Sequence, residues 1–349
     1  MKKEYVNELD LLRFLAALSV TLFHLAHRSA SVYGTSALPF QPLAGIADYG
    51  YMGVDLFFMI SGFVVMGSAQ NATVGSFVMG RITRLYPAFF FCCTVAFTVL
   101  LAFGQPPVPT VGTYLANMTM QPHFFSAVWL DPTYWTLALE IRFYFLLTLL
   151  VLFKQVHNAE RWSYAWLGAI FMLMIFPVER LHSKLLVPFA PYFVAGITFH
   201  YLRMHGTSTA RLATLLICYI LSLYDAVAMI KGQPLYANLS YVVACLATTG
   251  FYAAFYLIAT RKTGRLGQYR WATLGLLTYP LYLIHQPVCT IMLSTFAPAI
   301  NQQVVLWGSL IVALLVAYLI HIYVERPLAA AMRNLVPTVR QLLARQPAG

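Results

Sequence analysis

The stretch ELDLLRFLAALSVTLFHLAHR, residues 8–28, shows the pattern that decides the fold: a long apolar run that holds a few polar side chains. Similar runs recur along the 349 residues, of which 60% are hydrophobic and only 9% are charged. The mean hydropathy is +0.71. Because a helix needs about 20 apolar residues to cross a bilayer, this composition predicts an integral membrane protein.

Ten apolar runs are long enough to be membrane spans. We therefore expect an all-α, polytopic membrane protein with about ten transmembrane helices, and a single membrane-embedded domain over residues 1–349. Its helical core is expected at about 8–327, followed by a short basic tail at 328–349. The predicted spans lie near 9–27, 53–69, 87–104, 134–153, 162–177, 185–203, 211–230, 235–259, 273–296 and 303–324.

The N-terminal run could also be a cleaved signal peptide, since lysines precede it. Against that interpretation, Glu4, Glu8 and Asp10 dilute the basic region and Arg13 interrupts the apolar run. Nine further predicted spans follow. We expect the first run to stay in the protein as a span.

The positions of the lysines and arginines indicate the orientation, because cytoplasmic loops retain an excess of them. An inside N-terminus assigns sixteen of the 22 to the cytoplasm and only Arg28, Arg180, Lys184 and Lys231 to the other side, which predicts that both termini are cytoplasmic. The net charge of +11 then suits anionic membrane lipids, and no nucleic-acid partner is expected. The sixteen are Lys2, Lys3, Arg81, Arg84, Lys154, Arg161, Arg203, Arg211, Arg261, Lys262, Arg265, Arg270, Arg326, Arg333, Arg340 and Arg345.

Two ionisable side chains lie in the first span. Arg13 and His24 are eleven residues apart, which is close to three helical turns, so they share one helix face with a rise of ~16 Å between them. Ionisable residues inside a membrane usually face a bundle interior and mark a functional path. A snorkelling arginine and a packed histidine are the alternative interpretation.

Further polar residues lie within later spans. Asp55 is placed near the outer end of the second span, Glu140 in the outer half of the fourth, and His285 near the middle of the ninth. Such residues are candidates for catalysis or for a proton path. Alternatively, either carboxylate pairs with Arg142 or with a backbone group.

Polar side chains also gather at the inner ends of spans. The segment FVMGRITRLYP holds Arg81 and Arg84 three residues apart, and HIYVERP holds His321 and Glu325. Arginines at this spacing can share a helix face, and their guanidinium groups suit phosphate oxygens. Alternatively, the two arginines only reflect the general excess of positive charge on the cytoplasmic side of membrane proteins. The five cysteines lie in predicted spans without a metal-binding spacing, so we expect them to pack and expect no metal.

Taken in order, Arg13-x10-His24, GVDLFFMISGFV, RITRLYP, WTLALEIRFYF and YLIHQP resemble the membrane acyltransferase 3 family of bacterial O-acyltransferases that act on cell-surface glycans. The resemblance covers roughly residues 8–327. It implies transfer of an acyl group, usually acetyl, from cytoplasmic acyl-CoA to a sugar hydroxyl across a bacterial inner membrane. Some family members carry a further hydrolase-like domain; this sequence ends about 25 residues after its last predicted span, so we expect none here.

This resemblance, read with the residue chemistry, gives each candidate a role. Three arginines are expected to hold the phosphates of acetyl-CoA or another acyl-CoA, whose long arm would reach toward His24. His24 is expected to act as general base or as a transient acyl carrier, because imidazole titrates near neutral pH. Glu140 or Asp55 could orient the ring of His24. Three further side chains are assigned to the acceptor, a surface glycan or lipid-linked sugar. The assignments are catalytic His24, Glu140 and Asp55; donor-binding Arg13, Arg81 and Arg84; and acceptor-binding Trp135, Tyr144 and His285.

Other functions use some of the same residues. In a proton-coupled secondary transporter or lipid-linked sugar flippase, His24, Asp55, Glu140 and His285 would form a proton relay. Such a relay needs no pair of phosphate-binding arginines. A membrane scaffold would leave the shared face of Arg13 and His24 unexplained. The sequence therefore favours the acyltransferase.

Overall fold

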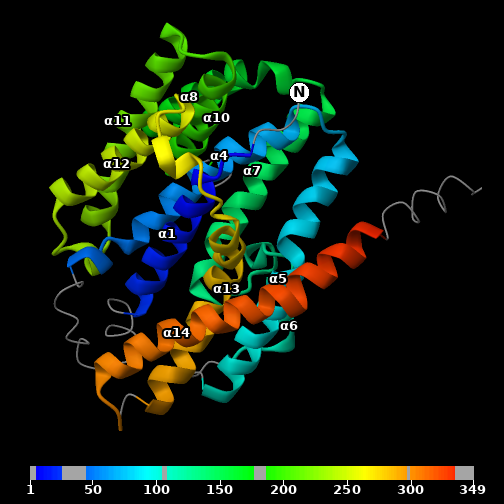
Figure 1. Ribbon diagram of the computed structural model, residues 1–349, viewed down its shortest axis with the longest axis vertical. Helices are drawn as coiled ribbons and strands as arrows, with labels where there is room; N and C mark the ends of the chain where they lie inside the picture. Colours follow the sequence, from blue (N-terminus) through cyan, green and yellow to red (C-terminus); the bar gives the residue numbers. More distant parts are fainter. Residues whose placement is uncertain (1–4, 26–44, 104–107, 177–185, 297–298, 335–349) are drawn as a thin grey trace, which may run out of the picture. The chain divides into compact units, whose positions relative to one another are not determined.

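The computed structural model describes residues 5–25, 45–103, 108–176, 186–296 and 299–334, and in these residues the chain is helical and holds no strand (Figure 1). Most of the predicted basic tail lies outside the described residues, as do parts of the first, third, fifth and sixth predicted spans. Seven of the charges used to predict the orientation also lie outside them: Lys2, Lys3, Arg28, Arg180, Lys184, Arg340 and Arg345.

A helix coincides with each predicted span. In the described part of the chain, seven helical segments are long and apolar enough to cross a membrane. The helices at the first, fifth and sixth spans are not among them and have 16, 17 and 16 described residues. The all-helical class is confirmed for the described residues, whereas the count of about ten spans and the cytoplasmic termini stay predictions. The bounds are α1 Glu8–Phe23, α4 Gly53–Ala69, α5 Val74–Phe103, α7 Trp135–Leu152, α8 Ala159–Ile175, α10 Ala190–His205, α11 Thr209–Gly232, α12 Tyr241–Ala259, α13 Ala272–Phe296 and α14 Gln302–Ile320.

The segment between the third and fourth spans contains structure that the apolar pattern did not reveal. Its helix α6, Val111–Met118, begins after Thr110, whose side chain accepts a hydrogen bond from the backbone N–H of Thr113. This is an ordinary N-cap. Two short 3-10 turns follow, η3 Pro122–Phe125 and η4 Pro132–Tyr134, and the second leads directly into α7.

The described residues form two compact units. The first lies within Met1–Val74 and Thr136–Gly275, and the second within Gly75–Trp135 and Leu276–Gly349. In the first unit α4 contacts both α1 and α10, and α10 also contacts α8, α11 and α12 (Figure 1). The prediction of one membrane domain concerns the whole chain and stays a prediction.

Two glycines allow α4 and α10 to approach closely. A Cβ atom added to Gly62 of α4 would collide with the carbonyl oxygen of Phe193, and one added to Gly196 of α10 would collide with that of Met59. Small residues are typical where membrane helices pack backbone against backbone. This contact fixes α4, which carries Asp55, against the most buried helix of the unit.

The outward faces of several helices are apolar. Large exposed side chains include Phe90 on α5, Phe171 on α8, Leu216 on α11 and Leu246 on α12. Large apolar surfaces are rare on soluble monomers, whereas lipid tails suit them. The surface therefore agrees with a multi-pass membrane protein.

In the second unit, the membrane helices contain prolines. Pro87 lies inside α5, and Pro280 and Pro287 lie inside α13. Membrane helices tolerate such residues where neighbouring side chains satisfy the backbone. A separate contact joins two of these helices: the Tyr279 hydroxyl of α13 donates to the carbonyl oxygen of Leu85 in α5, at 3.1 Å.

Candidate active site

His24 is the C-cap residue of α1 and directly follows its last α-helical residue, Phe23. Its side chain is half-buried, and its ring lies edge-on to that of Phe23, with 5.1 Å between the centroids. The ring of Phe23 in turn contacts Tyr51 and Tyr236 at 5.8 and 6.1 Å. The predicted base therefore sits beside an aromatic cluster.

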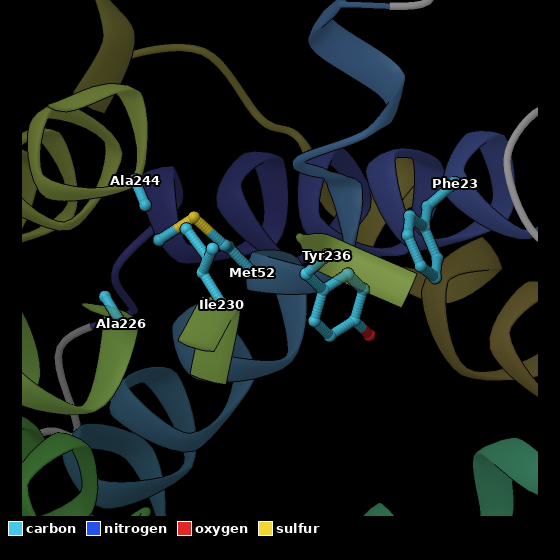
Figure 2. Close-up of a cluster of buried hydrophobic side chains, with 6 residues drawn as sticks. All are labelled: Phe23, Met52, Ala226, Ile230, Tyr236 and Ala244. Atoms are coloured by element: carbon cyan, nitrogen blue, oxygen red, sulfur yellow. The ribbon is translucent and has the colours of Figure 1, made fainter. Parts of the chain in front are cut away.

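A cluster of buried apolar side chains holds this end of α1 (Figure 2). Its members come from α1, from the turn η2 Gly50–Met52, from α11 and α12, and from the turn η6 Pro234–Tyr236. Tyr51 stacks on Tyr236 with 4.5 Å between ring centroids. Segments far apart in the sequence thus fix the helix end that carries His24. The six members are Phe23, Met52, Ala226, Ile230, Tyr236 and Ala244.

Glu140 receives hydrogen bonds from two hydroxyl groups in the same unit. Ser61 of α4 donates to its Oε1 atom at 3.2 Å, and Tyr144, one turn later on α7, donates to the same oxygen. The structure therefore brings together two of the predicted site residues, Glu140 and Tyr144. Because Tyr144 is buried and its hydroxyl is already bonded, it supports the carboxylate in this conformation.

Asp55, near the start of α4, belongs to a second polar group. Its carboxyl group accepts a hydrogen bond from Tyr192 of α10, and Asp225 of α11 is an acidic neighbour. The Tyr192 hydroxyl also lies 3.4 Å from the carbonyl oxygen of Ser222. Sequence reasoning missed Asp225, although an aspartate inside the seventh predicted span was a signal of the kind used for Asp55.

Arg13 forms an ion pair with Asp10, one turn earlier on α1, at 3.2 Å. Asp10 is buried and also accepts a hydrogen bond from Tyr5. A carboxylate thus partly balances the charge of Arg13, which weakens its attraction for a phosphate. The donor-binding role of Arg13 stays a prediction.

The start of α1 is joined to the loop before α13, and we call these contacts the N-terminal clamp. The Asn7 amide donates to the carbonyl oxygen of Gly267 at 3.0 Å, and the Thr263 hydroxyl donates to Glu8. Both Glu8 and Asp10 are buried, and a Cβ atom on Gly275 would collide with Asp10. The clamp holds a basic loop against the end of α1 that carries Arg13.

The two arginines assigned to the donor phosphates have different surroundings in the second unit. The Arg84 Nη1 atom lies 2.6 Å from Glu325, which also accepts a hydrogen bond from His321 at 2.8 Å. The guanidinium group of Arg81 lies over the ring of Phe77, 5.8 Å from its centroid. The sequence predicted these polar residues at inner ends of spans but did not pair them.

His285 is fully buried on α13. Its Nδ1 atom lies 2.8 Å from the carbonyl oxygen of Tyr282. Because a carbonyl oxygen only accepts, Nδ1 carries the proton, and in the neutral ring Nε2 is then an acceptor. Trp135 is half-buried at the start of α7. The acceptor-binding roles of these two residues stay predictions.

Among the residues that the structure describes, no group of three or more His, Cys, Asp or Glu side chains could hold a metal ion. The five cysteines are free, and four of them are buried.

Residues 6–322 match the acyltransferase 3 family, described as "Acyltransferase domain". The match spans nearly the whole chain, so the protein belongs to this family. It includes every predicted site residue and ends just before Glu325.

Individual relatives match shorter regions. Nodulation protein 10 of Rhizobium leguminosarum bv. viciae is 29% identical over 168 residues, which are 42% of this chain and 44% of the relative. A putative acetyltransferase of Acidianus two-tailed virus, ORF330, is 29% identical over 155 residues, 43% of this chain and 42% of the relative. The O-acetyltransferase OatA of Staphylococcus aureus is 27% identical over 168 residues, 43% of this chain and 25% of the relative. The matches thus span less than half of these relatives. No solved structure matches.

Proposed function

We propose that this protein is a membrane O-acyltransferase that moves an acyl group, most simply acetyl, from cytoplasmic acyl-CoA to a hydroxyl of an extracytoplasmic sugar or polysaccharide. The bacterial inner membrane is its proposed location. The observation that carries the proposal is the family match over residues 6–322, which includes His24, Arg81, Arg84 and Glu140. The name of the relative OatA, O-acetyltransferase, supports an oxygen acceptor.

His24 is proposed as the reactive base. It takes the proton from the sugar hydroxyl while that oxygen attacks the thioester carbonyl, so that the C–O bond forms, the C–S bond breaks and CoA leaves as the thiol after protonation. In the two-step form, an imidazole nitrogen of His24 attacks first and carries the acyl group to the sugar. Either route needs the ring at a fixed place, and the aromatic cluster at the end of α1 supplies that support.

Arg81 and Arg84 are proposed to bind the phosphates of the donor, with Arg13 as a further contact. The Arg84 side chain is 39% exposed, so it is accessible to a ligand. Guanidinium groups bind phosphate oxygens through paired, charge-assisted hydrogen bonds. Donor binding and chemistry are therefore assigned to different residues, and variants can separate them.

The chemical role is tested with purified protein in lipid nanodiscs, labelled acetyl-CoA and a glycan acceptor. His24→Ala should keep CoA binding but lower acetyl transfer by about 10²–10⁴, the usual contribution of a general base. His24→Gln should not restore transfer, because an amide cannot take the proton. Near-normal transfer by His24→Ala would contradict the role of His24 and leave it a packed residue.

The donor-binding role is tested with the double variant Arg81→Ala and Arg84→Ala. It should lower the affinity for CoA at least about tenfold, because each charge-assisted contact contributes about 1.5–3 kcal/mol. Transfer should recover partly at high acetyl-CoA concentration. Unchanged CoA affinity would exclude the arginine pair as the donor site, and no CoA release by the unmodified protein would overturn the proposed function itself.

A further inference from the structure

The ion pair between Arg84 and Glu325 joins residues 241 positions apart in the sequence. Glu325 is almost completely buried, with 7% of its side chain exposed, and both of its oxygens are used. Oε1 accepts from Arg84 at 2.6 Å and Oε2 accepts from the Nδ1 atom of His321 at 2.8 Å. Within the second unit, this carboxylate is therefore held between two side chains that donate to it.

The guanidinium group of Arg84 is held along one edge only. Its Nη1 atom binds Glu325, and the ring of Tyr279 lies 5.6 Å from its central carbon. Its Nε and Nη2 atoms donate no hydrogen bond within the described residues. These two atoms form the fork that binds two oxygens of one phosphate in parallel. The pair thus presents the ligand-binding edge of the arginine.

His321 and Glu325 are the first and last residues of a rare backbone form. α14 ends at Ile320, and residues His321–Glu325 continue as the π-helix η8. The wider turn is less common than the α-helix and occurs frequently at functional sites. The hydrogen bond between the two side chains lies within this turn. The irregular turn and the charged cluster therefore coincide.

We propose that Glu325 is a positioning residue for the acyl donor: it holds Arg84 so that the Nε and Nη2 edge meets a donor phosphate, and His321 supports Glu325 in turn. This inference rests on the proposed function, in which Arg84 binds the donor. The family match does not reach Glu325, because it ends at residue 322.

Two physical effects of Glu325 oppose one another, and this makes the inference testable. A carboxylate beside an arginine weakens the attraction between that arginine and a phosphate. On the other hand, a long side chain loses conformational entropy when a ligand orders it, and a side chain already held in place loses less. If positioning dominates, removing the carboxylate raises the KM for acetyl-CoA. If Glu325 only competes with the phosphate, its removal lowers that KM.

The first test compares Glu325→Gln and Glu325→Ala with the unmodified protein in nanodiscs. We expect the KM for acetyl-CoA and the Kd for CoA to rise about threefold to tenfold, the effect of losing one hydrogen bond, while kcat stays within about twofold. A thermal-unfolding measurement identifies variants that fail to fold. A lower or unchanged KM in folded Glu325→Gln would overturn the inference.

The second test uses two amides at position 321. The amide nitrogen of asparagine lies where Nδ1 of histidine lies, whereas glutamine places its amide near the position of Nε2. We therefore expect His321→Asn to keep a nearly normal KM, and His321→Gln and His321→Ala to raise it about twofold to fivefold. Equal effects of asparagine and glutamine would contradict support through Nδ1.

The third test asks whether Glu325 acts through Arg84. In an Arg84→Ala background, Glu325→Gln should not raise the Kd for CoA further, whereas in an Arg81→Ala background its effect should persist, because the contact between Arg84 and Glu325 remains. Equal effects in both backgrounds would overturn the inference. If the unmodified protein neither binds CoA nor releases it from acetyl-CoA, the proposed function fails; if it does both and only these couplings are absent, the positioning role alone fails.

Discussion

Several charged side chains of the candidate site bind near neighbours. Arg13 forms an ion pair with Asp10, and Arg84 forms one with Glu325. Glu140 accepts hydrogen bonds from two hydroxyl groups. Removing a charge from a membrane interior leaves its partner uncompensated, which costs more than losing the pair as a whole. Substitutions that keep the hydrogen bonds of these residues but change their charge are therefore the most informative.

Glu140 allows such a comparison. Glu140→Gln keeps an acceptor for Ser61 and Tyr144 but removes the charge that would stabilise a protonated His24. We expect kcat to fall about 10- to 100-fold, corresponding to a lost charge-assisted interaction of about 1.5–3 kcal/mol. Steady-state transfer of acetyl from labelled acetyl-CoA measures it.

The matched control for Glu140 is Tyr144→Phe, which removes one hydroxyl donor and leaves the carboxylate charged. Its kcat should fall only about twofold to tenfold. If Tyr144→Phe proved as damaging as Glu140→Gln, the charge of Glu140 would not be the important property, and the proposed interaction with His24 would have to be abandoned.

Sequence reasoning found most of the charged residues but not their partners. Arg84, His321 and Glu325 were each recognisable as polar residues at the ends of apolar runs, because a charge in a span stands out locally. The pairing of Arg84 with Glu325 depends on the contact between α5 and η8 and has no local signal. The neighbour of Asp55, Asp225, was visible in the sequence and was missed.

Among the helices, the approach of α4 to α10 is closest at the two glycines. Gly62→Ala and Gly196→Ala should each destabilise the protein by about 1–3 kcal/mol, the usual cost of overpacking, because the added methyl group meets backbone that cannot move aside. Thermal unfolding in detergent, followed by loss of the monodisperse peak in gel filtration, measures the effect.

Gly168, inside α8, is the control for this contact. An added Cβ atom there meets nothing within 4 Å, so Gly168→Ala should be neutral or should stabilise the protein by about 0.5–1 kcal/mol through lower backbone entropy in the unfolded chain. A similar fall in unfolding temperature for all three variants would show that the contact between α4 and α10 is not special.

Apolar runs predicted where the helices lie better than where they begin. The third predicted span begins at 87, whereas α5 begins at Val74, because Arg81 and Arg84 lower the local hydropathy without opposing a helix. The eighth predicted span begins at 235, whereas α12 begins at Tyr241, after a separate turn that starts at Pro234. Hydropathy reports the part of a helix that suits lipid, not its full length.

For the whole molecule, the orientation is the first property to establish. If the assignment of charges is right, cysteines introduced at Thr207 and Lys262 should be shielded from an impermeant thiol reagent added outside cells, and one introduced at Ser126 should react. All three positions are exposed on the protein surface. Gel shifts with a maleimide-polymer reagent measure the labelling.

Two nearby positions are unsuitable for labelling. Gln121 lies in the same segment as Ser126 but is buried, and Thr263 donates to Glu8 in the N-terminal clamp. The unmodified protein, with its five free cysteines, gives the background. Labelling at Thr207 and Lys262 from outside, with Ser126 protected, would show that the true orientation is the reverse of the predicted one. The donor-binding arginines would then lie on the wrong side for cytoplasmic acyl-CoA.

The N-terminal clamp also has a consequence for how the protein is made. Glu8 is made with the first helix, but Thr263 is synthesised 255 residues later. At about 5–20 residues per second, the ribosome needs about 13–51 s to reach it. Through that interval Glu8 cannot have the hydroxyl partner that it has in the finished protein. The N-terminal clamp therefore closes only late in synthesis, when the loop before α13 has left the ribosome.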